Sequence, residues 1–323
     1  MLGTRLPVLA IDVGGTKILA ALIADGKMMF KDYSPTHAVR GIHAVVKHIF
    51  EAIDRVIGQT DRDLSQIHSI SIAAAGAIDT KNGIITLSPN LPGWRNVPLA
   101  KMVEEKYQAK TYLIHDANAA ALGEHRYGAG KGVRNLVFLT VSTGIGGGII
   151  INNKIYEGAA GAAGEIGHMT IDIHGPMCLC GNTGCLEMLA SGTAMAREAI
   201  RLIKAGKKSS LADMVNGNID TITAREIATA AEDGDFVAIA AINWSATNLG
   251  VGLVNVVNIF NPEMIIIGGG VSNFGELLLE PARKVVGERA FPYLAQMVKI
   301  VRAKLGDDAG VIGAEVFAKG QKT

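Results

Sequence analysis

Three cysteines, Cys178, Cys180 and Cys185, occupy one segment of eight residues and are the only cysteines in the chain. The spacing C-x-C-x4-C places three soft sulfur ligands on one short loop, and a tetrahedral zinc site would need one further ligand. His168 and His174 are both close in sequence, and Cys3His is a common set of zinc ligands. A disulfide would leave one thiol over and is typical of smaller secreted domains, whereas an iron–sulfur cluster usually takes four thiolates. The pattern therefore favours zinc over a disulfide or inert thiols, and it leaves the histidine ligand open.

Glycine-rich turns occur three times and could hold a nucleotide. DVGGT at 12–16 leads into a strand-like segment, so it is neither the G-x-G-x-x-G fingerprint nor a P-loop. A turn between two strands can still form a nest of backbone N–H groups that binds phosphate, and Asp12 at its edge could hold Mg²⁺. STGIGGG at 142–148 repeats this arrangement, and GGG at 268–270 follows a hydrophobic strand. Each turn alone could be an ordinary hairpin, but three together favour a nucleotide site.

Single polar side chains near these segments could take part in acid–base chemistry or in hydrogen bonding. Asp116 lies between a strand end and a helix start, where it could be a general base or only a helix cap. Asn90, in the rigid loop SPNLPGW, can both donate and accept hydrogen bonds. Glu165 and His168 are three residues apart, so one turn points both side chains the same way. The alternatives are a solvated loop residue for Asn90 and a buried structural role for His168.

The segments that carry these residues predict alternating strands and helices. Strands are expected in 7–12, 17–24, 67–79, 111–115, 135–151, 263–268 and 298–305, and helices in 41–57, 224–234, 238–260 and 309–320. Thr223 and Glu226 form a T-x-x-E capping box before one helix. The pattern strand, glycine turn, strand, polar hairpin appears at the start of the chain and again roughly 130 residues later, which indicates an internal repeat. The fold class is therefore layered α/β.

Composition limits the class of protein. The chain has 323 residues, of which 49% are hydrophobic and 19% charged, with a formal net charge of +1. This size can bury a large core and usually divides into two domains, here without a flexible linker, so we expect them to sit close around a hinge. No basic block suggests a nucleic-acid partner, and no unbroken apolar run reaches the roughly 18 residues of a membrane span. The start of the chain does not look like a signal peptide, and reduced thiols fit a cytoplasmic protein.

Taken together, the repeated turns resemble the actin-like (ribonuclease H-like) ATPase fold, in which two similar domains clamp a nucleotide in an interdomain cleft. The motifs DVGGTK, SPNLPGW, HDANAAALGE, STGIGGG, GAAGEIGH and CLCGNTGCLE follow in this order. They resemble the ROK family of sugar kinases and repressors, and within it the glucokinases, over nearly the whole chain. One departure is Ala75, which stands where the family often has proline.

The resemblance implies ATP-dependent phosphorylation of a hexose, with glucose as the first expectation and N-acetylglucosamine, mannose or fructose as alternatives. It makes Asp116 the catalytic base and His168 the fourth ligand of a structural zinc. The implied sugar contacts are Asn90, Asp116, Glu165, His168, Glu187 and Gly76. The implied nucleotide and Mg²⁺ contacts are Asp12, Gly14, Gly15, Thr16, Lys17, Thr143, Gly144, Gly268, Gly269 and Gly270.

The resemblance also gives expectations about organisation and partners. A smaller domain is expected from residues 1–119 with 305–323, and a larger one from 120–304. Glucose and ATP are the expected partners, in a cytoplasmic homodimer without nucleic acid or membrane. A sugar-responsive transcriptional repressor is the alternative from another class. It is disfavoured because only about seven residues precede VLAID, too few for a DNA-binding domain.

Overall fold

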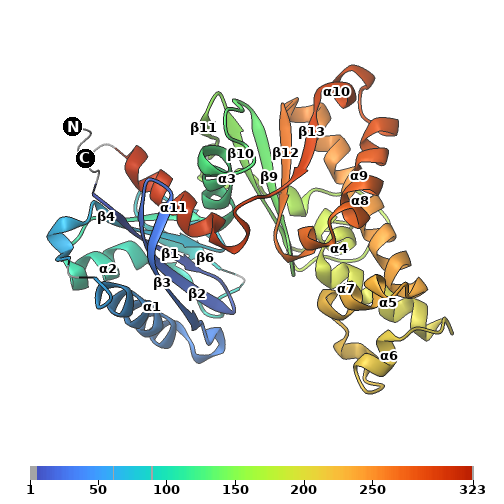
Figure 1. Cartoon of the computed structure of the whole chain (residues 1–323), viewed down its shortest axis with the longest axis horizontal. Coiled ribbons are helices and arrows are strands. Elements are labelled where there is room, and N and C mark those ends of the chain that lie inside the picture. The colour runs from blue at the N-terminus through green and yellow to red at the C-terminus, as the bar shows by residue number, and fades with distance from the viewer. Residues whose placement is uncertain (1–5, 61, 89, 322–323) are drawn as a thin grey trace. The chain divides into compact units, whose positions relative to one another are not determined.

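The computed structural model describes residues 6–60, 62–88 and 90–321 (Figure 1). The chain forms two compact units, one from residues 1–133, 148–164 and 304–323, and the other from 134–147 and 165–303. The sequence predicts domain boundaries after residues 119 and 304, and these boundaries stay a prediction. The first of them falls inside helix α3 (Asp116–Tyr127), which belongs to the first unit throughout.

The sheet of the first unit has the strand order β3-β2-β1-β4-β8. Its strands are β1 (Val8–Val13), β2 (Lys17–Ala24), β3 (Lys27–Pro35), β4 (Ser69–Ala74) and β8 (Thr111–His115). β2 runs antiparallel to β1 and β3, whereas β4 runs parallel to β1 and β8. Val13 pairs with Ala74, and Ala74 pairs with His115, so three parallel strands end level at one edge. In α/β sheets this carboxyl edge is where ligands bind.

Helices cover both faces of this sheet (Figure 1). Leu9 and Ile11 share a core with the apolar sides of α1 (Ile42–Ile57) and α2 (Leu99–Tyr107). The alternate residues of β1 point to the opposite face, where α11 (Ala309–Gly320) packs beside α3. A small antiparallel sheet, β5-β6-β7, extends the first core, and its strands are Ala77–Asp79, Ile84–Leu87 and Arg95–Val97.

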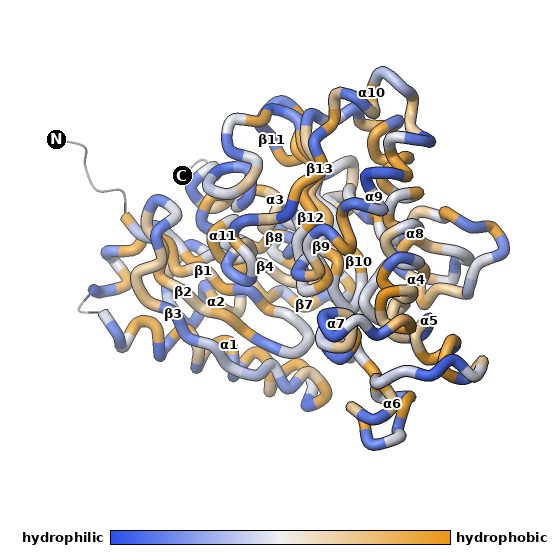
Figure 2. The backbone as a smooth tube through the Cα atoms, turned by 45° about the vertical axis from the view of Figure 1, so that its right-hand side comes forward, coloured by the Kyte–Doolittle hydropathy of each residue, from blue (hydrophilic) through white to orange (hydrophobic). Residues whose placement is uncertain are grey.

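The second large sheet repeats the first. Its order is β11-β10-β9-β12-β13, with strands at Lys154–Ile155, Ile145–Ile151, Leu136–Val141, Met264–Gly268 and Lys299–Arg302. β12 runs parallel to β9 and β13, as β4 does to β1 and β8. The predicted internal repeat is confirmed by this matching order. Figure 2 shows hydrophobic residues along β12, and the inner strands β9, β10 and β12 are largely buried.

The second unit is otherwise helical. Its helices are α4 (Leu186–Ala190), α5 (Gly192–Lys204), α6 (Leu211–Met214), α7 (Ala224–Glu232), α8 (Phe236–Phe260), α9 (Glu276–Arg289) and α10 (Pro292–Met297). The capping box predicted at Thr223 and Glu226 is present at the start of α7. By length and hydropathy α8 could cross a membrane, but 61% of its apolar window is buried inside the structure. It packs against α4, α5, α7 and α9 and is the core helix of this unit.

Close packing of α3 on α11 positions the carboxyl edge of the first sheet. A Cβ atom on Gly313 would lie 1.6 Å from the carbonyl oxygen of Ala119, and one on Gly123 would lie 2.6 Å from that of Ala309. The helices approach this closely because glycine leaves backbone against backbone. Since α3 begins at Asp116, this contact helps to fix the place of that carboxylate.

We expect Gly313→Ala to lower the free energy of unfolding by about 1–3 kcal/mol, because the added methyl group overpacks the contact. The matched control is Gly287→Ala in α9, where a Cβ atom would meet nothing within 4 Å. This control should be neutral or stabilise by up to about 1 kcal/mol through helix propensity. Thermal unfolding of both variants measures the difference, and equal melting temperatures would contradict the packing argument.

Candidate active site and metal centre

Two carboxylates lie near each other at the carboxyl edge of the first sheet. Asp12 is the fifth residue of β1, and Asp116 directly follows the last residue of β8. Burial raises the pKa of Asp12 to about 7, with a further contribution from the negative charge of Asp116 and a smaller opposing one from Lys17. Carboxylates held together in this way attract a divalent cation, so the pair fits the Mg²⁺ predicted at Asp12.

Asp116 occupies the first residue of α3 rather than the capping position. The N-cap residue is His115, which makes no side-chain capping bond. The Oδ1 atom of Asp116 accepts a 2.7 Å hydrogen bond from the adjacent Ala117 N–H and lies 3.3 Å from Nε2 of His115. An N-cap carboxylate would bond to the second or third helical N–H instead. With 35% of its side chain exposed, Asp116 is accessible to a substrate, as a general base must be.

The first glycine turn, Gly14 to Lys17, is fixed by backbone and threonine contacts. Gly14 N–H donates to the carbonyl of Lys17 at 3.0 Å, and Thr36 Oγ1 donates to the carbonyl of Gly14 at 2.7 Å. The Nζ atom of Lys17 lies 2.6 Å from Asp307, just before α11. The turn is thus a closed hairpin in which the Gly14 N–H is already bonded, and a phosphate nest there stays a prediction that would use the N–H groups after Gly14.

The predicted sugar loop lies against this turn. A Cβ atom on Gly15 would be 3.1 Å from the carbonyl oxygen of the exposed Asn90, so the two segments are in contact. Pro89 of the same loop lies outside the described residues. Gly76 has φ of 117°, and a Cβ atom there would be 2.3 Å from the carbonyl of Leu87. Backbone geometry therefore explains the glycine at 76, and a sugar contact there stays a prediction.

The second glycine turn is held by the start of α5. Ser142 N–H donates to Gly144 across the turn at 2.8 Å, and the Ser142 carbonyl accepts from Gly192 N–H at 2.7 Å. Thr193 Oγ1 donates to the carbonyl of Thr143 at 2.8 Å. These contacts fix the backbone of the turn against the start of α5.

The triple glycine follows β12, the parallel neighbour of β9. Gly268 pairs with Thr140, two residues before the second turn. Gly269 has φ of 78°, and a Cβ atom there would be 2.3 Å from the carbonyl of Val141. A Cβ atom on Gly270 would meet nothing within 4 Å. The structure thus brings 142–145 and 268–270 to one edge of the second sheet, as a shared nucleotide site requires.

Glu187 has a contact that the sequence analysis missed. Its Oε2 atom accepts a 2.8 Å hydrogen bond from Ile145 N–H, and a Cβ atom on Gly144 would lie 2.3 Å from the same oxygen. Glu187 therefore supports the second glycine turn, besides any contact with sugar. The two residues are 42 positions apart, and no spacing in the sequence signals the bond.

The Cys3His cluster is assembled as a metal site would require. The ligand atoms of His168, Cys178, Cys180 and Cys185 all lie within 4.8 Å of one another. The sulfurs of Cys180 and Cys185 are 3.7 Å apart, and Cys178 Sγ is 3.6 Å from Nδ1 of His168. Tetrahedral bonds of about 2.3 Å to sulfur and about 2.0 Å to nitrogen give ligand separations of about 3.8 and about 3.6 Å. The donor set and its spacing therefore fit zinc.

Electrostatics support a metal in this cluster. Burial raises the pKa of the Cys185 thiol to about 12, with hydrogen bonds from Cys180 and Cys178 adding to the shift. The backbone N–H of Asn182 lowers the pKa of Cys180. Three thiolates this close repel one another, so a divalent cation is needed to hold them all ionised. Binding of zinc would release the remaining thiol protons.

His168 has the orientation that the resemblance implied. Its Nδ1 atom faces Cys178, while Nε2 lies 3.9 Å from Oε2 of Glu165. His174 is exposed, and its backbone N–H donates to Asp172. The geometry therefore groups His168, and not His174, with the three cysteines.

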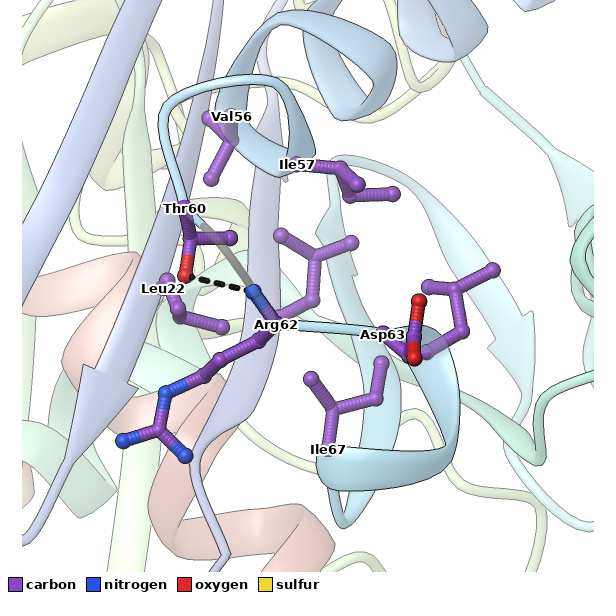
Figure 3. A pocket seen from close by; sticks show the side chains of 9 residues that line it. Leu22, Val56, Ile57, Thr60, Arg62, Asp63 and Ile67 are labelled. Carbon is purple, nitrogen blue, oxygen red and sulfur yellow. Dashed lines mark hydrogen bonds between the residues drawn. The ribbon is translucent and has the colours of Figure 1, made fainter.

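Two cavities among the described residues of the first unit contain no predicted site residue. One is a small hollow of about 10 Å³ lined largely by the aliphatic side chains of β1, β2 and α1 (Figure 3). Arg62 extends away from these side chains, and its backbone N–H bonds to Thr60. The other, about 460 Å³, is lined by His125, Arg126, Tyr127, Lys131, Gly132 and Asn153.

The model of the ROK family matches residues 8–321. The chain belongs to the ROK family. A glucokinase from Thermotoga maritima is 36% identical over 319 residues, which cover 98% of each chain. A xylose repressor from Caldicellulosiruptor bescii is 39% identical over 288 residues, which cover 89% of this chain and 71% of the repressor.

A solved structure from the family is similar over the full length. The ROK family glucokinase from Streptomyces griseus in complex with glucose and AMPPNP superposes with a TM-score of 0.87 at 34% identity, covering 98% of this chain and 100% of that one. The predicted two-domain actin-like fold is confirmed by this likeness to ROK kinases. ROK sugar kinases and ROK repressors are both among its relatives.

The geometry of the cluster predicts which variants lose zinc. Cys180→Ala and His168→Ala each remove one of four ligands, so both purified proteins should contain almost no metal. His174→Ala is the matched control and should keep about one zinc per chain, since a closed site needs four ligands. Elemental analysis measures this, and zinc retained in His168→Ala but lost from His174→Ala would overturn the assignment.

The raised pKa of Asp12 predicts a pH-dependent stability. A carboxyl whose folded pKa exceeds its unfolded pKa stabilises the fold fully below about 4, and this contribution is lost as pH rises through about 7. Asp12→Asn has no proton to lose. Its melting temperature relative to wild type should therefore increase between pH 5 and pH 8 by about 2 °C or more, measured with EDTA. The exposed Asp213→Asn is the control, and parallel curves for Asp12→Asn and wild type would contradict the shift.

Proposed function

We propose that this ROK protein is an ATP-dependent hexose kinase and that glucose is its substrate. The observation that carries the proposal is the pairing of Asp12 and Asp116 at one sheet edge, beside the first glycine turn. Phosphoryl transfer to a hydroxyl needs a metal ligand, a phosphate nest and a proton acceptor, and these residues can supply all three.

Asp116 would act as the general base. Its exposed carboxylate would accept the proton of the sugar hydroxyl as that oxygen bonds to phosphorus. It lies in the first turn of α3, at the partially positive helix N-terminus. Asp12 would hold Mg²⁺, and the ion, when bound, neutralises charge on the phosphate oxygens.

The sugar would be recognised by groups that both donate and accept hydrogen bonds. Asn90 offers an amide, and Glu165, Glu187 and Nε2 of His168 offer acceptors or a donor for hydroxyl groups. Zinc at Nδ1 of His168 would leave Nε2 protonated and fixed in direction. The metal would then have a structural role, with no open position for chemistry.

The nucleotide would use the two glycine turns. Backbone N–H groups in Gly15–Lys17 and in Thr143–Gly144 would bind phosphate oxygens, as such nests do. Gly270, with open space over its Cα, permits close approach of a flat ring. The AMPPNP in the Streptomyces griseus relative supports ATP as the donor.

A sugar-responsive regulator is the second candidate, favoured by the 39% identity to a xylose repressor. One observation supports the kinase over it. The chain has a carboxylate pair suited to metal-dependent transfer, which sugar sensing alone does not need.

A sugar panel tests the proposal. ADP release is measured with ATP and Mg²⁺ against glucose, mannose, fructose, N-acetylglucosamine and xylose. We expect saturable turnover, with the highest kcat/KM for glucose. A higher kcat/KM for another sugar would overturn the substrate assignment alone. Binding of xylose without turnover of any sugar would favour the regulator.

We expect Asp116→Asn to keep glucose affinity and to lose kcat by about 10²–10⁴-fold, because the amide preserves shape but cannot take a proton. Calorimetry gives the glucose affinity, and coupled-assay kinetics give kcat. The exposed Asp213→Asn removes one charge away from the proposed site, so it serves as the control for loss of charge and should keep wild-type kcat. A variant with a quarter or more of wild-type kcat would show that Asp116 is not the base.

A further inference from the structure

Glu124 is a fully buried carboxylate in α3 that the proposed reaction does not use. Its Oε2 atom accepts a 2.7 Å hydrogen bond from Ala129 N–H. Its Oε1 atom accepts bonds of 2.8 Å from Lys304 N–H and 2.6 Å from Leu305 N–H. Burial of an ionised carboxylate is costly, and three short backbone hydrogen bonds are a specific compensation.

These three donors belong to two of the segments where the chain passes between its two compact units. The first unit contains residues 1–133, 148–164 and 304–323, so the chain passes between the units four times, first after Val133 and last before Lys304. The Glu124 carbonyl also accepts from Gly128 N–H and Gly130 N–H, each at 3.0 Å. The next residue, His125, bonds through Nε2 to the carbonyl of Val133 at 2.9 Å. One end of α3 therefore anchors the chain at the first and the last of these passages.

The segment after Leu305 reaches the nucleotide side of the first unit. Asp307 pairs with Lys17 of the first glycine turn, and Gly310 lies against the carboxylate of Asp12. Glu124 thus fixes the start of the segment 304–310. Later residues of this segment contact Asp12, the proposed metal ligand, and Lys17 of the first glycine turn. The same helix carries Asp116 at its other end.

We propose that Glu124 is a positioning residue for phosphoryl transfer. It ties the first and the last chain passage to the helix that carries the base and holds residues 304–310 against Asp12 and Lys17. This inference rests on the proposed function for its kinetic consequence, whereas the clamp itself can be tested without activity.

Glutamine is the sharpest substitution, because it keeps the shape and removes the second acceptor. A carboxylate accepts on both oxygens, but an amide accepts on one and donates on the other. In either orientation, Glu124→Gln sets its NH2 group against a backbone N–H, at Ala129 or at the pair Lys304 and Leu305. Glu315→Gln is the matched control. Glu315 is also fully buried in the first unit, but it accepts from Gly26 N–H, away from both passages.

Hydrogen–deuterium exchange followed by mass spectrometry tests the clamp. We expect amides in peptides 126–134 and 302–306 to exchange about tenfold faster in Glu124→Gln, because lost hydrogen bonds open locally. Glu315→Gln should leave these peptides at the wild-type rate. Wild-type exchange in Glu124→Gln, or equal acceleration in both variants, would overturn the clamp.

Steady-state kinetics of zinc-loaded enzyme test the positioning role. In Glu124→Gln we expect the KM for ATP to rise and kcat to fall, each by about threefold to tenfold, with the KM for glucose nearly unchanged. Glu124→Asp keeps the charge and should recover part of both losses. If local exchange increases in Glu124→Gln while KM and kcat stay at their wild-type values, the positioning role is overturned. A wild type without sugar kinase activity would refute the proposed function, and the exchange result would still decide the clamp.

Discussion

Burial of one carboxylate beside a second is the constraint on which the proposed site of the first unit depends. Asp12 and Asp116 are placed at one sheet edge by the level ends of β1 and β8, and burial, with a further contribution from the charge of Asp116, raises the pKa of Asp12 to about 7. Such an arrangement lowers stability near neutral pH unless a cation is bound. Lys17, the helix N-terminus at Asp116 and the packing of Gly310 on Asp12 keep the pair in place. An unfavourable electrostatic arrangement of this kind is expected where a site is organised for binding.

The second unit depends on a different kind of constraint. Its loop from His168 to Cys185 has an exposed middle, so ligand bonds to a metal would supply order that a hydrophobic core does not. Cys185 leads directly into α4, and Glu187 in that helix bonds to the second glycine turn at Ile145. A metal in the cluster would therefore fix both the loop itself and the backbone of the second glycine turn. The hydrogen bond from Ile145 N–H to Glu187 links the turn to the helix that follows the cluster.

The sequence predicts those features whose cause is local. Apolar runs that end in glycine or acid locate the strand ends, Thr223 and Glu226 mark the start of α7, and cysteine spacing locates the metal cluster. Helix α9 was not predicted; Pro281 lies in its middle, where proline disfavours a helix, and the helix packs against α8. The hydrogen bond between Glu187 and Ile145 joins residues 42 positions apart, and the one between Glu124 and Leu305 joins residues 181 positions apart, so no pattern along the chain encodes them. The length and charge of a side chain do not reveal its partner.

The central claim is that a phosphoryl group passes from ATP to a hydroxyl group of the sugar. Phosphorus-31 NMR of a reaction with ATP, Mg²⁺ and glucose labelled with carbon-13 at C6 tests it directly. We predict that the ATP signals are replaced by those of ADP and of a phosphomonoester whose phosphorus is coupled to the labelled carbon. Inorganic phosphate as the sole phosphorus product besides ADP, or ATP left unchanged, would contradict the account.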